Sequence, residues 1–172
     1  PLAQGIVDQF TELGLRIFGP TKAAARIETS KSFAKELMFK NRIPTGTMQA
    51  FDSYREAKEY LERVDLPLVL KADGLATGKG VTICRTRDEA FRALHRTMVE
   101  RCFGAAGDRI LVEEFLEGQE ISVFAFTDGV HLSSLVAACD YKRALDDNRG
   151  PNTGGIGSYS PPTIWNDTLE TQ

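Results

Sequence analysis

Glycines and lysines are interleaved in the stretch KADGLATGKGV at residues 71–81. The ammonium groups of Lys71 and Lys79 could neutralise phosphate oxygens, and glycines let backbone N–H groups approach a phosphate because they lack Cβ and tolerate positive φ. The spacing fits neither a dinucleotide-binding loop nor a P-loop, since Gly80 stands where a P-loop requires a hydroxyl side chain. We interpret the stretch as a phosphate-binding loop of another kind; an ordinary hairpin with solvated lysines is the alternative.

The residues on either side of this loop predict two strands. LPLVLKA at 66–72 is a short apolar run, and GVTICRT at 80–86 alternates and is β-branched, which is typical of a buried strand followed by a second strand. The glycines therefore join strand to strand, whereas both known fingerprints require a strand followed by a helix. A hairpin loop of this kind can fold over a triphosphate and donate backbone N–H groups to it.

The segment VEEFLEGQE at 112–120 predicts a strand, a turn at Gly118 and a returning strand. An adenine needs one backbone carbonyl and one backbone N–H, and a strand that stops pairing at residues 114–116 has such groups free. The carboxylate of Glu120 could accept hydrogen bonds from two ribose hydroxyls. A surface hairpin with a solvated acidic face accounts for the same residues.

Lys31 lies in the segment TSKSFAKEL. Helical periodicity runs from Thr21 to about Lys40, and Thr29-Ser30 suggests a break with a new N-cap, so Lys31 is expected in the first turn of a helix. An anion bound there would interact with both the lysine and the helix N-terminus. A solvated surface lysine is the simpler alternative.

The segment CDYKRALDDNRGPNTGGIGSYSPP at 139–162 is polar, rich in glycine and without periodicity. A loop of this length is uncommon in a compact domain and is frequently functional. Its glycines would let backbone N–H groups converge on a small polar substrate, and packing residues such as Ile156 and Trp165 argue against a disordered linker. The residues that could contact such a substrate are Asp140, Lys142, Arg143, Asn152, Gly154, Gly155 and Gly157.

Further helices and strands must position these residues. Ser53 with Glu56 and Thr86 with Glu89 are spaced as capping boxes, which predicts helices at 53–64 and directly after Thr86. A helix is also expected at 1–14 and a short capped one after Asn166; strands are expected at 15–18, 47–51, 109–115, 120–127 and 131–137. Residues 47–115 are therefore expected to form a compact α+β unit, in the order strand, helix, two strands, helix and strand.

Composition narrows the class of protein. Of the 172 residues, 42% are hydrophobic and 26% charged, and the net charge of −3 gives no basic surface for nucleic acid or an anionic membrane. No apolar stretch is long enough to span a bilayer. Three cysteines without a C-x-x-C pair favour a reduced, cytoplasmic setting. Both ends look cut, because the chain starts within a helix and stops soon after another begins.

The order of these pieces resembles the ATP-grasp superfamily: a lysine on a lead-in helix, a lysine ending a strand, a glycine-rich hairpin and an acidic strand-turn-strand. The sequence itself more closely resembles the phosphoribosylamine–glycine ligase family, whose signatures are similar to IFGPTKAAARIETSKSFAKELM, IPTGT, LKADGLATGKGV, VEEFLEGQE, DYKR and GPNTGGIGSYSPP. The resemblance implies an α+β, partial ATP-grasp fold preceded by the last helix and strand of an α/β N-terminal domain. Its implied parts are that tail at 1–22, linker helices at 23–46, the lid subdomain at 47–116 and an incomplete central subdomain at 117–172.

The resemblance further implies an ATP-dependent ligase of purine biosynthesis. It would convert glycine to glycyl phosphate and join it to 5-phosphoribosylamine, with Mg²⁺ or Mn²⁺ held by ligands beyond Gln172, so this segment alone is expected not to turn over. Another ATP-grasp carboxylate–amine ligase, or a nucleotide-binding module without catalysis, is the alternative. The implied ATP-binding residues are Lys31, Lys71, Gly78, Lys79, Gly80, Glu113, Glu114, Phe115, Leu116 and Glu120, and the implied substrate-binding residues are Asp140, Lys142, Arg143, Asn152, Thr153, Gly154, Gly155 and Gly157.

Overall fold

The computed structural model describes residues 1–76, 79–146 and 149–171, with the side chains of 151 and 152 left aside. The chain forms two compact units, Pro1–Leu116 and Glu117–Gln172. The border between them coincides with the end of the expected lid subdomain; the assignment of all four parts to named subdomains stays a prediction.

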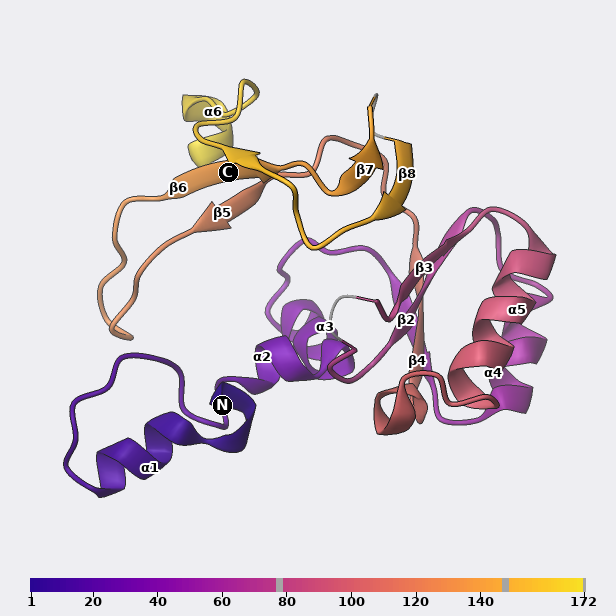
Figure 1. The fold of residues 1–172 in the computed structure, drawn as a ribbon, viewed down its shortest axis with the longest axis horizontal. Helices are drawn as coiled ribbons and strands as arrows, with labels where there is room; N and C mark the ends of the chain where they lie inside the picture. The colour runs from indigo at the N-terminus through magenta and orange to yellow at the C-terminus, as the bar shows by residue number, and fades with distance from the viewer. Residues whose placement is uncertain (77–78, 147–148, 172) are drawn as a thin grey trace. The chain divides into compact units, whose positions relative to one another are not determined.

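The first unit is built on a four-stranded antiparallel sheet in the order β1-β4-β2-β3 (Figure 1). Its strands are β1 (Met48–Phe51), β2 (Leu68–Ala72), β3 (Val81–Cys84) and β4 (Ile110–Glu114). All four were predicted from the sequence. The glycine-rich stretch joins β2 to β3, two neighbouring strands, as the alternation of the flanking segments indicated.

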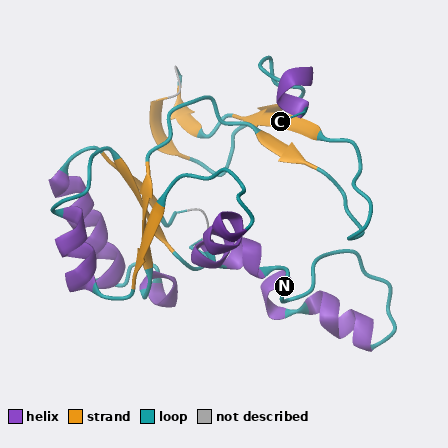
Figure 2. Cartoon of the chain, turned by 180° about the vertical axis from the view of Figure 1, so that it is seen from behind, coloured by secondary structure: helices purple, strands orange, loops and turns teal. Residues whose placement is uncertain are grey.

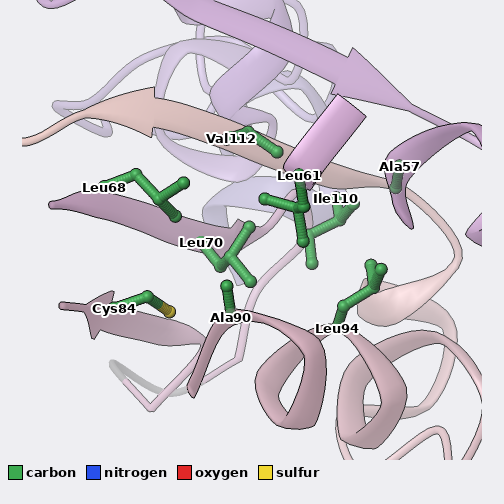
Figure 3. Close-up of a cluster of buried hydrophobic side chains, with 9 residues drawn as sticks. All are labelled: Ala57, Leu61, Leu68, Leu70, Cys84, Ala90, Leu94, Ile110 and Val112. Atoms are coloured by element: carbon green, nitrogen blue, oxygen red, sulfur yellow. The ribbon is translucent and has the colours of Figure 1, made fainter. Parts of the chain in front are cut away.

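Two helices, α4 (Tyr54–Leu61) and α5 (Arg87–Met98), cover one face of this sheet (Figures 1 and 2). Thr86 and Glu89 form the predicted capping box, and the Ser53 side chain accepts the N–H of Glu56. Figure 3 shows the core that results: Ala57 and Leu61 of α4, Ala90 and Leu94 of α5, and Leu68, Leu70, Cys84, Ile110 and Val112 of the sheet.

Strand alternation fixes which side chains occupy the other face. Leu68 and Leu70 of β2 point into the core with α4 and α5, so Lys71 between Leu70 and Ala72 projects from the opposite face. The same argument places Glu113 of β4 opposite to Val112. Helix α3 (Lys31–Lys40) lies on that opposite side (Figures 1 and 2).

The helical segment before the sheet breaks where the sequence predicted. Helix α2 (Arg26–Thr29) ends at Ser30, whose side chain accepts the N–H of Phe33 and caps α3. The Arg26 guanidinium lies 3.9 Å from the centre of the Phe33 ring. Lys31 is thus the first residue of α3, as expected.

The predicted strand at 15–18 is wrong. The N-terminal residues form a short 3₁₀ helix η1 (Leu2–Gln4) and α1 (Ile6–Glu12), but 15–18 join no sheet of the described residues. Apolar residues favour a strand only where a neighbouring strand can take their backbone N–H and C=O groups. The side chains of Leu15 and Phe18 are exposed, so local apolar character alone misled the prediction.

The second unit holds a three-stranded sheet in the order β5-β6-β9 and a separate two-stranded sheet β7-β8. The elements are β5 (Ser122–Phe124), β6 (Val136–Asp140), β7 (Arg143–Leu145), β8 (Arg149–Asn152), β9 (Ser158–Tyr159) and α6 (Asp167–Glu170), which the side chain of Asn166 caps. The first unit also contains the 3₁₀ helix η2 (Gly104–Gly107). None of the helices described is long and apolar enough to cross a membrane.

Three predictions in the second unit need correction, and the first is the strand expected at 120–127, of which only β5, Ser122–Phe124, forms. The strand expected at 131–137 starts later, at Val136, because the Asp128 carboxylate accepts the N–H groups of Val130 and His131 and so builds a turn. The stretch 139–162 is not one irregular loop, since it contributes to β6 and contains β7, β8 and β9. Its backbone pairing, rather than side-chain periodicity, forms these short strands.

Candidate functional site

A buried carboxylate, Glu113, forms the centre of the charged cluster in the first unit. Lys71 donates to Glu113 Oε2 at 2.6 Å. In the antiparallel register Val69 lies opposite Glu113 and Lys71 lies opposite Leu111, so the two charged residues are diagonal neighbours on the same face. The sequence had assigned Lys71 to phosphates and Glu113 to the adenine region, and the structure brings the two side chains together.

Lys35 is a member of this cluster that the sequence analysis missed. Its Nζ lies 3.3 Å from Glu113 Oε2 and donates to Thr45 Oγ1 at 2.7 Å and to the Gly46 carbonyl at 2.9 Å. The available signal was its spacing: Lys35 follows Lys31 by four residues and therefore shares a face of α3.

Lys31 is bound to the root of the glycine-rich loop. Its ammonium donates to the carbonyls of Ala72 at 2.8 Å and Gly74 at 3.0 Å, with the Asp73 carbonyl at 3.5 Å. Burial lowers the pKa of Lys31 below its ordinary value, against the opposing charge of Asp73. To reach a phosphate, Lys31 must give up one or more of these carbonyls.

The anion at the N-terminus of α3 is a side chain of the protein itself. The Asp73 carboxylate accepts the Ser32 N–H at 2.7 Å and the Ser32 hydroxyl at 2.7 Å. It therefore takes the place that the sequence analysis considered for a bound anion, and it fastens the loop root to α3. A prediction from local sequence could not find this contact, because Asp73 and Ser32 are 41 residues apart.

Packing explains the glycine at position 80. A Cβ there would lie 2.6 Å from the Cβ of Ala76 and 3.2 Å from that of Ala72. Lys79 is exposed, and its backbone N–H donates to the Ala76 carbonyl at 2.9 Å. Gly78, another predicted phosphate contact, lies outside the described residues.

The end of β4 has some of the backbone groups that an adenine needs. Glu114 does not supply them: its N–H donates to the Thr47 carbonyl at 3.0 Å, and its carboxylate accepts from Thr47 N and Oγ1. Among the described residues, the backbones of Phe115 and Leu116 make no hydrogen bond. Of the predicted stretch 113–116, its last two residues are the available ones.

In the second unit, Lys142 joins two predicted sites. Its ammonium donates to Glu120 Oε1 and lies 3.6 Å from Asp140 Oδ1. The hydrogen bond to Glu120 raises the pKa of Lys142 above its ordinary value. Glu120, predicted for a ribose, and Asp140 and Lys142, predicted for the substrate, therefore form one cluster.

The glycine-rich segment after β8 is joined to Tyr141 and Lys142. The N–H of Thr153 donates to the Lys142 carbonyl, that of Ile156 to the Tyr141 carbonyl, and that of Gly155 to Thr153 Oγ1. Gly155 has a φ of +100°, which favours glycine. These N–H groups are used within the protein, while Gly154 and Gly157 have no backbone N–H partner in the described part of the chain.

The remaining predicted substrate residues lie in the β7–β8 sheet. Arg143 donates to the Gly150 carbonyl at 2.7 Å, and Asn152 is its partner in the strand register. No group of three or more His, Cys, Asp or Glu side chains that could hold a metal occurs among the residues described. Glu113 and Glu120 each pair with a lysine.

Comparison with known proteins gives a consistent result. The sequence family described as "Phosphoribosylglycinamide synthetase, ATP-grasp (A) domain" matches residues 29–172. Phosphoribosylamine–glycine ligases of Halalkalibacterium halodurans and Streptococcus pneumoniae serotype 4 are 52% identical over 97% of the chain and 51% identical over 93% of it. The chain spans 39% and 38% of the length of these two relatives.

Solved structures agree with this match. A phosphoribosylamine–glycine ligase from Thermotoga maritima is 37% identical, with a TM-score of 0.79 over 86% of this chain and 38% of that one. A D-alanyl-alanine synthetase A from Vibrio cholerae shares the fold alone, at 16% identity and a TM-score of 0.69 over 99% of this chain and 52% of that one. The biotin carboxylase domain of a Hydrogenobacter thermophilus 2-oxoglutarate carboxylase, solved with MgADP, also shares the fold alone. It is 20% identical, with a TM-score of 0.71 over 95% of this chain and 36% of that one. The expected α+β, partial ATP-grasp fold is confirmed.

Proposed function

Since the chain belongs to the phosphoribosylamine–glycine ligase family, we propose that the protein carrying it joins glycine to 5-phosphoribosylamine at the expense of ATP. The products are glycinamide ribonucleotide, ADP and phosphate. The observation that carries the proposal is the 52% identity over 97% of the chain to a protein of that name. The reaction belongs to purine biosynthesis and acts on small molecules; we place it in the cytoplasm.

Two displacement steps make up this reaction. A carboxylate oxygen of glycine attacks the γ-phosphorus of ATP, and the bond to the bridging oxygen breaks with its electron pair leaving on ADP. The amine of phosphoribosylamine then attacks the acyl carbon of glycyl phosphate, and the C–O bond to phosphate breaks. The amine nitrogen loses a proton as the amide forms. Neither step needs a covalent intermediate on the protein, so positioning and charge neutralisation are the tasks of its residues.

Lys71 is the side chain of the first unit best suited to the nucleotide. It ends β2 beside the glycine-rich stretch, and within the described residues its ammonium has one partner, Glu113. An ammonium has three N–H donors, so two are unused in this arrangement, and all three can meet phosphate oxygens once Lys71 turns away from Glu113. The exposed Lys79 and the loop that Gly78 and Gly80 belong to would add contacts, and Lys31 would join after releasing a carbonyl.

The other predicted residues have roles that follow from their unused groups. The backbone of Phe115 and Leu116, which has no hydrogen-bond partner within the described residues, is proposed to hold the adenine together with the neighbouring Glu113 and Glu114, and Glu120 is proposed to hold the ribose. For glycine and the phosphoribosyl group we propose Asp140, Lys142, Arg143, Asn152, Thr153, Gly154, Gly155 and Gly157. Mg²⁺ or Mn²⁺, when bound, would neutralise phosphate charge, and we assign its ligands to residues outside this chain.

The proposal is tested on the full-length protein by measuring ADP release. Release is expected to require both glycine and phosphoribosylamine, and Lys71→Ala should lower kcat/KM for ATP by about 100-fold, the scale of one lost contact to developing phosphate charge. Lys40→Ala, at an exposed position in the last turn of α3, is the matched control and should leave the rate unchanged. Release driven by bicarbonate or formate in place of glycine would assign the protein to another ligase, and no substrate-dependent release would make it a nucleotide-binding module.

A further inference from the structure

Glu113 interacts with three lysines, Lys31, Lys35 and Lys71. Their ammonium groups differ in how many hydrogen-bond or ion-pair partners they have. Lys31 donates to three backbone carbonyls. Lys35 has three oxygens around it, from Thr45, Gly46 and Glu113. Lys71 has only Glu113 within the described residues. Since an ammonium has three donors, Lys31 and Lys35 are saturated and Lys71 is not.

Lys35 and Lys71 contact the same atom, Oε2 of Glu113, at 3.3 Å and 2.6 Å. The side chain of Glu113 is 6% exposed, that of Lys35 is 13% exposed and that of Lys71 is 26% exposed. One carboxylate is therefore shared by a deeply placed lysine and a more accessible one. The three groups together carry one excess positive charge.

This arrangement decides whether Lys71 can turn to another anion. A buried carboxylate that loses its only cation is strongly destabilising, because the charge is left without solvent and without a partner. Lys35 removes this penalty: when Lys71 leaves, Glu113 and Lys35 remain as a neutral pair. Lys35 itself is held in place, because its ammonium also donates to Thr45 Oγ1 and to the Gly46 carbonyl.

We propose that Lys35 is a positioning residue: it is the resident counter-ion of Glu113, and it releases Lys71 to bind the phosphates of a nucleoside triphosphate. This rests on the proposed function, which supplies the nucleotide. The role is specific to charge, and it differs from that of a lysine that simply anchors residues 45–46 to α3. The second oxygen of Glu113, Oε1, is buried and has no hydrogen-bond partner in the described part of the protein, so the ion pairs that compensate this carboxylate there, those of Lys35 and Lys71, both act through Oε2.

A double-mutant cycle in the full-length protein separates these roles. The dissociation constant for Mg-ATP is measured by calorimetry for the unmodified protein, Lys35→Met, Glu113→Gln and the double variant. Lys35→Met should weaken binding about tenfold, a coupling of ordinary size for contacting charges. In the Glu113→Gln background the same change should cost less than about twofold, because a neutral glutamine does not hold Lys71. Lys35→Arg should keep affinity, and Lys40→Met on the same helix should change nothing.

A second measurement needs no nucleotide. Acetic anhydride acylates the neutral amine of accessible lysines, so an ion pair, which favours the ammonium form, slows the reaction. Peptide mass spectrometry measures the acetylation of Lys71 relative to that of the exposed Lys40. Lys35→Met should slow acetylation of Lys71 several-fold, because Lys71 is then the one lysine within the described residues that pairs with Glu113. If Lys35→Met does not fold, Lys35→Gln, which keeps a donor near Thr45 and Gly46, replaces it.

The outcomes point in different directions. Loss of affinity in both backgrounds to the same extent, or unchanged acetylation of Lys71, would show that Lys35 is only an anchor and overturn the inference. Normal Mg-ATP binding by Lys35→Met would overturn it too, while leaving the proposed function intact. No Mg-ATP binding by the unmodified protein would overturn the proposed function and the inference with it. The inference is supported if Lys35→Met weakens Mg-ATP binding only in the protein that retains Glu113, and if acetylation of Lys71 is slower in Lys35→Met.

Discussion

Replacing Gly80 with alanine tests why this loop has a glycine at that position. The new Cβ would lie 2.6 Å from the Cβ of Ala76 and 3.2 Å from that of Ala72, a buried residue of β2. Relieving such a contact costs about 1–3 kcal/mol. Lower chain entropy of the unfolded state returns about 0.4–1 kcal/mol. Taking the middle of each range, about 2 and about 0.7 kcal/mol, we expect the β2–β3 end of the sheet to lose about 1.3 kcal/mol, a factor of about 9 in its opening equilibrium.

Amide hydrogen exchange measures this loss of local stability at a single hydrogen bond. The N–H of Ala72 donates to the Gly80 carbonyl at 2.8 Å, so its exchange reports local opening at the substituted residue. Ligand-free protein is used, and exchange at Ala72 should accelerate by the factor given above. Gly154→Ala is the matched control, because a Cβ at Gly154 meets nothing within 4 Å.

The alternative explanation of Gly80 makes the opposite prediction. If glycine is needed there only for close approach of a phosphate, Gly80→Ala would leave exchange at Ala72 unchanged in the absence of ligand and weaken nucleotide binding alone. That pattern would refute the packing argument. Faster exchange without ligand would show that the glycine serves the protein's own packing first.

Two further predictions concern the first unit. Thr86→Ala should lower the free energy of unfolding by about 1 kcal/mol, because the Thr86 hydroxyl accepts the Glu89 N–H at 3.2 Å in the capping box of α5. Thr86→Ser keeps the hydroxyl and should retain most of the stability. Equal urea midpoints for the two variants would contradict the role of the cap. Burial raises the pKa of the Cys84 thiol from 9.0 to about 11, so the fold favours the neutral thiol: this contribution to stability is complete below pH 9 and is lost as pH rises to about 11. Thermal unfolding across that range should fall more steeply for the unmodified protein than for Cys84→Ala, and identical slopes would show that Cys84 is not responsible.

The parts of the fold that were predictable from sequence are those whose signals are local. Alternation and apolar runs were enough for the strands on both sides of the glycines, and the spacing of Thr86 and Glu89 was enough for the start of α5. Residues 15–18 had the same apolar signal but no strand to pair with among the residues described. A strand is a property of two segments, so its prediction from one of them is less secure than that of a capped helix.

The site was predictable in residue type but not in pairing. Lys71, Glu113, Glu120 and Lys142 were all identified from their positions in motifs. Their contacts depend on strand register and on side chains far apart in the sequence: Lys71 and Glu113 are 42 residues apart, and Lys142 and Glu120 are 22 apart. Lys35 was missed for the same reason, since its role depends on Glu113 and on Thr45, which no local pattern connects.

Both units show the same relation between the charges assigned to ligands. Lys71 pairs with Glu113 in one, and Lys142 pairs with Glu120 in the other, so in both pairs one predicted ligand group is neutralised by another. Moving Lys71 to a phosphate exchanges one ion pair for another, and freeing Glu120 for a ribose exchanges an ion pair for neutral hydrogen bonds, so the net free energy is smaller than the number of charges suggests. Such an exchange is favourable only where a cation remains for the carboxylate that is left. In the first unit Lys35 meets that requirement, whereas in the second Asp140, 3.6 Å from Lys142, adds a further negative charge. Lys142 is consequently expected to contact a substrate while it remains paired with a carboxylate, whereas Lys71 is able to leave its carboxylate.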